Sequence, residues 1–216
     1  MKASKILSSF SLMVGMMACV AGAQANSILN GDFETGTYAD WTLFTNPGGT
    51  LGPSPLPDIN LFDVTGSGAT NAARVQIGSA GGGISQVITV GAGLLSVSAN
   101  IAAWDSNSDD GANADWGTFQ LLIDGTVVDT VSFGSPTCCD PVRDSLNGSL
   151  SVGTGSHEIE FLVTRGFATG SLGATPFEYI DNVVADGAAV AAAPAPATLV
   201  LFGLGLAALG WSCRKR

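Results

Sequence analysis

The sequence predicts an all-β protein, built as one antiparallel β-sandwich with an apolar segment at each end of the chain. Roughly nine to eleven short stretches rich in β-branched and aromatic residues read as strands. Gly, Pro, Asn and Asp punctuate the intervals between them, as turns require. No stretch of useful length shows the period of an amphipathic helix. These three observations together favour a sandwich.

The first strands are short. Residues 27–36 followed by Trp41 predict a strand, a polar loop and a second strand, with Trp41 in the core. The stretch 46–58 contains four prolines and three glycines, and is expected to be an irregular loop. Residues 60–64 and 73–77 are strand candidates on either side of a Gly-rich turn.

The middle of the chain shows clearer patterns. Residues 84–90 and 94–104 predict two strands joined by a turn at Gly91–Gly93. In the second strand, small and apolar residues alternate with mostly polar ones, which is the period of a half-buried strand. Further on, Asp124–Gly125 is a hairpin signal. The remaining predicted strands are 118–124, 126–133, 145–152, 157–164 and 177–185.

Residues 1–25 have the features of a signal peptide. A basic start is followed by the apolar run from Ile6 to Val20, and Ala23-Gln24-Ala25 is an A-x-A cleavage site. We expect the mature protein to begin at Asn26, after export by the Sec machinery and cleavage by signal peptidase.

The last residues form an ordered series after the sandwich domain, 26–187, and the linker, 188–193. The apolar residues 197–213 would span about 25 Å as a helix, the lower limit for crossing a membrane. Because the end of the chain is basic, that end should stay cytoplasmic, with the domain outside. The motif and basic residues are Pro194, Ala195, Pro196, Arg214, Lys215 and Arg216.

This tail, residues 194–216, resembles a PEP-CTERM sorting signal. The resemblance implies an exported protein of a Gram-negative bacterium, held briefly in the inner membrane, cut by an exosortase and delivered to the cell surface or the extracellular space. It also implies an association with exopolysaccharide. Ala195 stands where this family usually has glutamate, so either the tail is cut or it remains as an anchor.

The charge of the predicted domain is strongly negative. Residues 26–187 hold all 18 carboxylates and three arginines, a formal charge of −15. Nucleic-acid binding is disfavoured, because phosphate contacts need Lys and Arg. Calcium is a natural counter-charge. The alternative is that the acidic surface only keeps an exported protein soluble.

A calcium site is predicted in the loop 105–115, where oxygen-bearing side chains recur closely enough to wrap one ion. A solvated acidic loop is the other interpretation. The candidate ligands are Asp105, Asn107, Asp109, Asp110 and Asp115.

Three landmarks are similar to carbohydrate-binding modules with the galactose-binding-like fold. They are the opening 30–36 with Trp41, the pair 84–90 and 93–97, and the closing stretch 179–183. The resemblance implies a jelly-roll sandwich. It also implies a structural calcium ion held by Glu34 and Asp181, with backbone carbonyls near Gly36.

Two tryptophans are candidate glycan platforms, Trp104 and Trp116, which flank the acidic loop. The domain's cysteines, Cys138 and Cys139, could form a vicinal disulfide, pair with other molecules, or stay as thiols. His157 is the only histidine, and no catalytic motif is present, so we expect no enzyme. The predicted role is a surface or matrix protein, and the alternative is a glycan-binding module. A glycoside hydrolase is less favoured.

Overall fold

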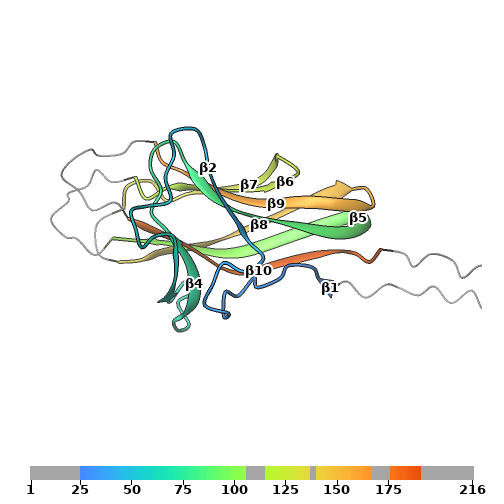
Figure 1. Cartoon of the computed structure of the whole chain (residues 1–216), viewed down its shortest axis with the longest axis horizontal. Coiled ribbons are helices and arrows are strands. Elements are labelled where there is room, and N and C mark those ends of the chain that lie inside the picture. The colour runs from blue at the N-terminus through green and yellow to red at the C-terminus, as the bar shows by residue number, and fades with distance from the viewer. Residues whose placement is uncertain (1–24, 106–114, 137–139, 167–175, 191–216) are drawn as a thin grey trace, which may run out of the picture.

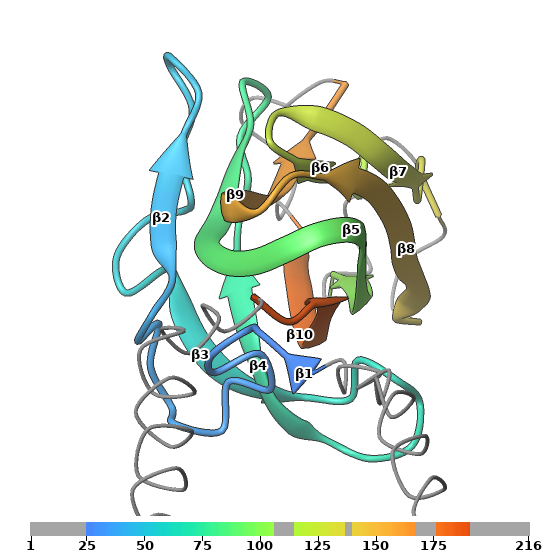
Figure 2. The same ribbon diagram turned by 90° about the vertical axis from the view of Figure 1, so that its right-hand side faces the viewer.

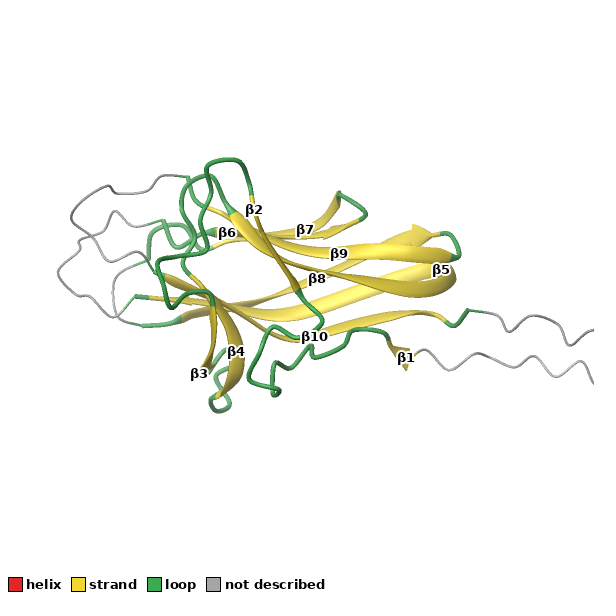
Figure 3. Cartoon of the chain, viewed as in Figure 1, coloured by secondary structure: helices red, strands yellow, loops and turns green. Residues whose placement is uncertain are grey.

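The computed structural model describes residues 25–105, 115–136, 140–166 and 176–190. Within these ranges the regular structure consists of strands alone (Figure 3). The strands are β1 (Ala25–Asn26), β2 (Thr42–Thr45), β3 (Asp58–Phe62), β4 (Thr70–Val75), β5 (Gly82–Trp104), β6 (Thr118–Ile123), β7 (Thr126–Ser132), β8 (Val142–Val152), β9 (Gly155–Thr164) and β10 (Phe177–Ala188).

The strands form two layers, and every pairing is antiparallel (Figure 1). Sheet A has the order β3-β4-β10-β5-β8, with β1 also paired to β10. Sheet B has the order β2-β5-β9-β6-β7. The predicted antiparallel β-sandwich is therefore confirmed.

Strand β5 belongs to both sheets. Its first part, Gly82–Val90, pairs with β9, and its second part, Gly93–Ala103, pairs with β8. Figure 2 shows the bend between the two layers. The predicted reversal at Gly91–Gly93 is confirmed, because both ends of β5 lie at the same end of the sandwich: Gly117 lies against Val163, the partner of Gly82, and against Glu178, the partner of Ala103. Pairing with β8 and β9 continues on either side of the turn, so the two predicted strands form one strand, β5. Gly91 allows the bend, since an added Cβ would lie 2.5 Å from the Ala189 carbonyl oxygen.

The core lies between the two sheets. Sheet A contributes Leu95, Ile101 and Ile180, and sheet B contributes Ile84 and Phe161, each 2 % exposed or less. Burial of this apolar surface is the main force that holds the layers together. Trp41 is 7 % exposed and stacks on the ring of Phe33, so its predicted core position is confirmed.

The hairpin predicted at Asp124–Gly125 joins β6 and β7 as expected. Both residues have positive φ, 50° and 72°, which suits a two-residue turn between twisted strands. The first strand predicted within residues 27–36 was wrong, because residues 27–40 form turns and irregular chain, and β1 lies just before them.

The two ends of the described chain lie together, because β1 pairs with the last part of β10 (Figure 1). The predicted signal peptide and the predicted transmembrane helix, 197–213, fall outside the described residues. No helix long and apolar enough to span a membrane occurs within the described ranges.

Candidate functional site

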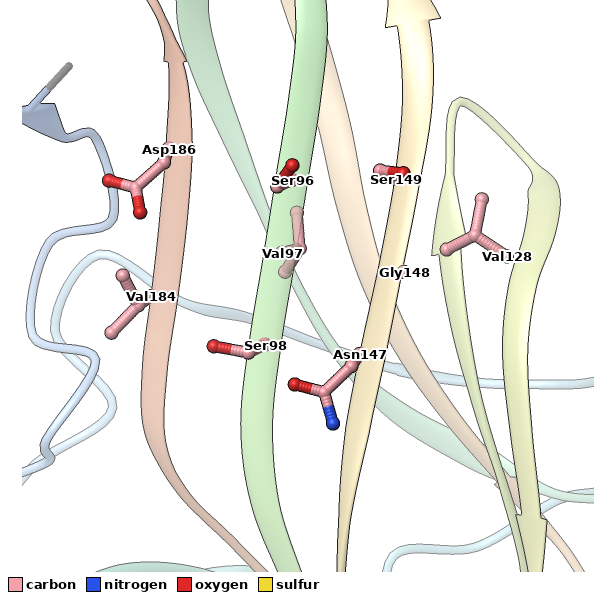
Figure 4. Close-up of a pocket in the computed structure, with 9 residues that line it drawn as sticks. All are labelled: Ser96, Val97, Ser98, Val128, Asn147, Gly148, Ser149, Val184 and Asp186. Carbon is pink, nitrogen blue, oxygen red and sulfur yellow. The ribbon is translucent and has the colours of Figure 1, made fainter.

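A groove of about 490 Å³ lies on the outer face of sheet A, over β10, β5 and β8 (Figure 4). Its lining combines uncharged polar residues with three valines: Ser96, Ser98, Asn147 and Ser149 with Val97, Val128 and Val184. Asp186 is the one charged residue among the described lining residues. Hydroxyl and amide groups of this kind can donate and accept hydrogen bonds without demanding a charged ligand.

Strand periodicity explains why these groups gather on one face. Leu95 and Val97 point into the core, so Ser96 and Ser98, which alternate with them along β5, face outward. Across the sheet, Ser98 is paired with Asn147, and Ser96 with both Ser149 and Asp186. The register therefore places polar side chains from three neighbouring strands side by side.

Strand β7 of sheet B closes the groove beside β8. Val128 packs directly over Gly148, where an added Cβ would lie 2.3 Å from Val128 Cγ2. Next to it, the amide of Asn147 donates a hydrogen bond to Asp129 Oδ2 at 2.7 Å. Asp129 thus satisfies a backbone donor on the free edge of β8.

An aromatic cluster occupies the other end of the same face. The rings of Phe62 and Tyr179 stack with centroids 3.8 Å apart, and Trp104 lies 6.0 Å from Phe62. Tyr179 is buried, whereas Phe62 and Trp104 are half-buried. Trp104 has the same parity along β5 as Ser96 and lies about 26 Å from it along the strand.

Arg74 lies beside this cluster and contacts Phe177 and Asp58. Its guanidinium lies 4.8 Å from the centre of the Phe177 ring and binds both carboxylate oxygens of Asp58, at 2.8 and 2.6 Å. The Tyr38 hydroxyl can donate a hydrogen bond to either of two backbone carbonyl oxygens, that of Asp58 at 3.0 Å or that of Arg74 at 3.1 Å. Burial raises the pKa of Tyr179, so its phenol stays neutral.

The two predicted glycan platforms have different outcomes. Trp104 lies on the outer face of sheet A beside Phe62, on the same face as the groove. The prediction that Trp116 offers an exposed ring was wrong, because this residue is 2 % exposed and packs with Ala103 and Phe133. Its ring closes the end of the core where the chain enters β6.

Glu34 and Asp181, predicted to share a calcium ion, both contact the start of β4. Glu34 accepts hydrogen bonds from the amide and the side chain of Asn71, each at 3.0 Å. Asp181 Oδ2 accepts one from Thr70 Oγ1 at 2.8 Å. Burial raises the pKa of Asp181, and the charges of Glu34 and Asp32 raise it further.

This arrangement does not complete a metal site by itself. Within the described ranges, no group of three or more Asp, Glu, His or Cys side chains is placed to hold a metal ion. Backbone carbonyls would have to supply further ligands, as calcium permits. Calcium at Glu34 and Asp181 stays a prediction.

The second predicted calcium loop is described only at its ends. Asp105 and Asp115 are buried, 4 % and 8 % exposed. Asp115 accepts hydrogen bonds from the amides of Gly117 and Gly166, so its carboxylate already anchors the start of β6. The other predicted ligands fall outside the described residues: Asn107, Asp109 and Asp110.

Sequence reasoning missed a buried ionisable cluster beside Asp115. Glu178 is fully buried, and its Oε2 accepts a hydrogen bond from the amide of Ile77 at 3.0 Å, while Oε1 has no partner. Arg165, 4 % exposed, donates to the carbonyls of Asp115 and Ile77. Burial raises the pKa of Glu178 to about 8. The only sign of this cluster in the sequence was a single glutamate between two aromatic residues, Phe177 and Tyr179, in a predicted strand.

Several other predicted residues fall outside the described ranges. They are Ala23, Cys138, Cys139 and the sorting residues Pro194, Ala195, Pro196, Arg214, Lys215 and Arg216. Ala25 and Asn26, on either side of the predicted cleavage site, form β1.

The PEP-CTERM protein-sorting motif matches residues 192–215. The chain therefore carries the sorting signal that its tail resembles, which implies export, anchoring by the tail and processing by an exosortase. No curated protein sequence matches the chain.

Solved structures similar to the chain include two carbohydrate-binding modules. One is TmCBM61 in complex with β-1,4-galactotriose, with 15 % identity, a TM-score of 0.46, and coverage of 74 % of this chain and 97 % of that one. Another is the CBM22-1 xylan-binding domain from Paenibacillus barcinonensis Xyn10C, with 14 % identity, a TM-score of 0.46, and coverage of 79 % and 99 %. These similarities carry no information about the ligand of this chain.

Proposed function

We propose that this chain is a non-catalytic surface or extracellular-matrix protein of a Gram-negative bacterium, sorted by an exosortase, whose sandwich binds polysaccharide. The sorting motif at 192–215 supports the first part of the proposal. The Sec machinery and signal peptidase would act before the exosortase.

The groove on sheet A is the observation that supports glycan binding. A polysaccharide offers rows of hydroxyl groups, and the groove offers uncharged donors and acceptors from β5 and β8, with the carboxylate of Asp186 from β10 beside them. Trp104 and Phe62 on the same face add half-buried aromatic surface. Binding sites commonly combine apolar rings with a few placed polar groups.

The charges in the groove favour binding over hydrolysis. Glycoside hydrolysis usually needs two carboxyl groups on opposite sides of the scissile bond. Among the described lining residues, Asp186 is the single carboxylate. The strongly acidic domain would also repel a polyanionic chain, which favours an uncharged polysaccharide.

Affinity electrophoresis tests this function: the domain, residues 26–190, is run through a gel that contains the exopolysaccharide of the producing strain, and its retardation measures binding. Ser98→Ala combined with Asn147→Ala should weaken binding about tenfold, because two hydrogen bonds of ordinary strength are lost. The matched control is Thr42→Ala, an exposed residue of sheet B. Equal affinities for both variants would exclude the groove. If no polysaccharide is retained, the structural matrix role is the better account.

Sorting is tested separately in cells. Pro194→Ala with Pro196→Ala should leave the full-length protein in the inner-membrane fraction, whereas the unchanged chain should lose its tail in an exosortase-dependent way. Persistence of the full mass in the unchanged chain would mean that the Pro-Ala-Pro tail remains as an anchor.

A further inference from the structure

Both ends of the described chain leave the sandwich at one pole (Figure 1). Ala25 is paired with Gly187, and the amide of Ser27 donates to the Ala185 carbonyl at 2.9 Å. Strand β10 ends at Ala188, and the sorting motif begins four residues later, at residue 192. Four residues reach at most about 14 Å, so the motif begins close to this pole.

We call this end the tether pole, and define it as residues 91–94, 124–125, 153–157 and 188–190. Their contacts join them. The Ala92 amide donates to Thr154 Oγ1 at 3.0 Å, and His157 Nε2 lies 3.0 Å from the Gly153 carbonyl oxygen. The Ala189 carbonyl packs against Gly91.

The tether pole differs from the rest of the domain in charge. Its charged residues are Asp124 and His157, which pair with each other at 2.7 Å. The exposed Glu158 borders the pole, and its amide donates to Asp124 Oδ1 at 3.0 Å. The hydrogen bond that His157 donates to the Asp124 carboxylate raises the pKa of His157, which favours the cationic form that neutralises Asp124. Elsewhere the domain is strongly acidic, and Asp186, the nearest other carboxylate along β10, lies in the groove.

The tether pole also presents apolar side chains to solvent. Leu94 is 53 % exposed and Val190 is 49 % exposed. An anionic bilayer repels carboxylates and accepts apolar side chains at its interface. Because the sorting tail leaves the domain from this pole, Leu94 and Val190 are placed to contact lipid headgroups when the tail is anchored.

We propose that the tether pole rests on the outer surface of the inner membrane while the sorting tail anchors the protein. The groove then runs away from the membrane, and Trp104 lies about 40 Å from Ala92 along β5. The proposal rests on anchoring by the tail and is independent of glycan binding.

Lipid quenching tests this orientation in the full chain. All four cysteines, Cys19, Cys138, Cys139 and Cys213, are replaced by serine. A fluorophore is attached at Ala92→Cys or, as the control at the opposite pole, at Ser135→Cys. Both positions are exposed. The protein is reconstituted in vesicles of phosphatidylethanolamine and phosphatidylglycerol that contain brominated phosphatidylcholine.

We expect strong quenching at residue 92 and little at residue 135. Leu94→Glu with Val190→Glu should reduce quenching at residue 92, whereas Leu61→Glu, on the exposed edge strand β3, should not. Equal quenching at both poles, or no effect of the paired substitution, would overturn the proposal. If the chain does not associate with vesicles at all, anchoring by the tail, on which this proposal rests, is wrong.

Discussion

Glu178 Oε2 accepts a hydrogen bond from the amide of Ile77, whereas the other carboxylate oxygen of Glu178, Oε1, is buried without a hydrogen-bond partner. An unpaired carboxylate oxygen is costly to bury as an ion, so the neutral acid is favoured. Glu178 lies next to Arg165 and Asp115 at the start of β10, the end opposite to the one that pairs with β1. This contact makes the stability of the domain dependent on pH.

The folded-state pKa of Glu178, about 8, lies above its ordinary value of 4.5. Its stabilising effect is therefore complete below pH 4.5 and decreases as pH rises toward 8, by up to about 1.4 kcal/mol per pH unit. Glu178→Gln should flatten this dependence and match or exceed the unchanged domain at pH 8. Urea unfolding at pH 5, 6, 7 and 8 measures both. Parallel curves for the two proteins would contradict the assignment.

The seam between β7 and β8 should tolerate no added methyl group. Gly148→Ala should destabilise the domain by about 1–3 kcal/mol, because its Cβ would overlap Val128. Val128→Ala in the same chain should recover part of that loss. Gly153→Ala is the control, since an added Cβ there meets nothing within 4 Å. Equal unfolding midpoints for the two alanine variants would show that the seam adapts.

Calcium should raise the melting temperature of the domain by several degrees if Glu34 and Asp181 share an ion, because the ion binds only the folded state. Glu34→Gln should remove most of this shift. Asp109→Ala with Asp110→Ala should remove it instead if the acidic loop is the site. An unchanged melting temperature at millimolar calcium would exclude both proposed sites.

The strand pattern was largely predictable from the sequence because one face of each strand is buried. The Asp124–Gly125 hairpin and β9 and β10 follow from turn chemistry and alternation. The reversal at Gly91–Gly93 was predictable from its glycines, but the crossing of β5 from one sheet to the other was not. It depends on the pairing of the first half of β5 with β9 and of the second half with β8.

The site was less predictable than the fold. Trp104 and Trp116 have similar sequence surroundings, yet one lies on the outer face and the other closes the core. The groove depends on cross-strand register, which brings Ser98 and Asn147 together from positions 49 residues apart. Composition and local pattern do not encode such a pairing.

In the proposed function, the groove and Trp104 form one continuous glycan-binding face. Calorimetric titration with oligosaccharides of increasing length, prepared from the bound polysaccharide, tests it most directly. Affinity should rise with length until the ligand spans the roughly 26 Å from Ser96 to Trp104. Trp104→Ala should weaken only the long ligands, whereas Ser98→Ala should weaken short and long ligands alike. Affinity that is independent of length and unchanged by Trp104→Ala would contradict the account.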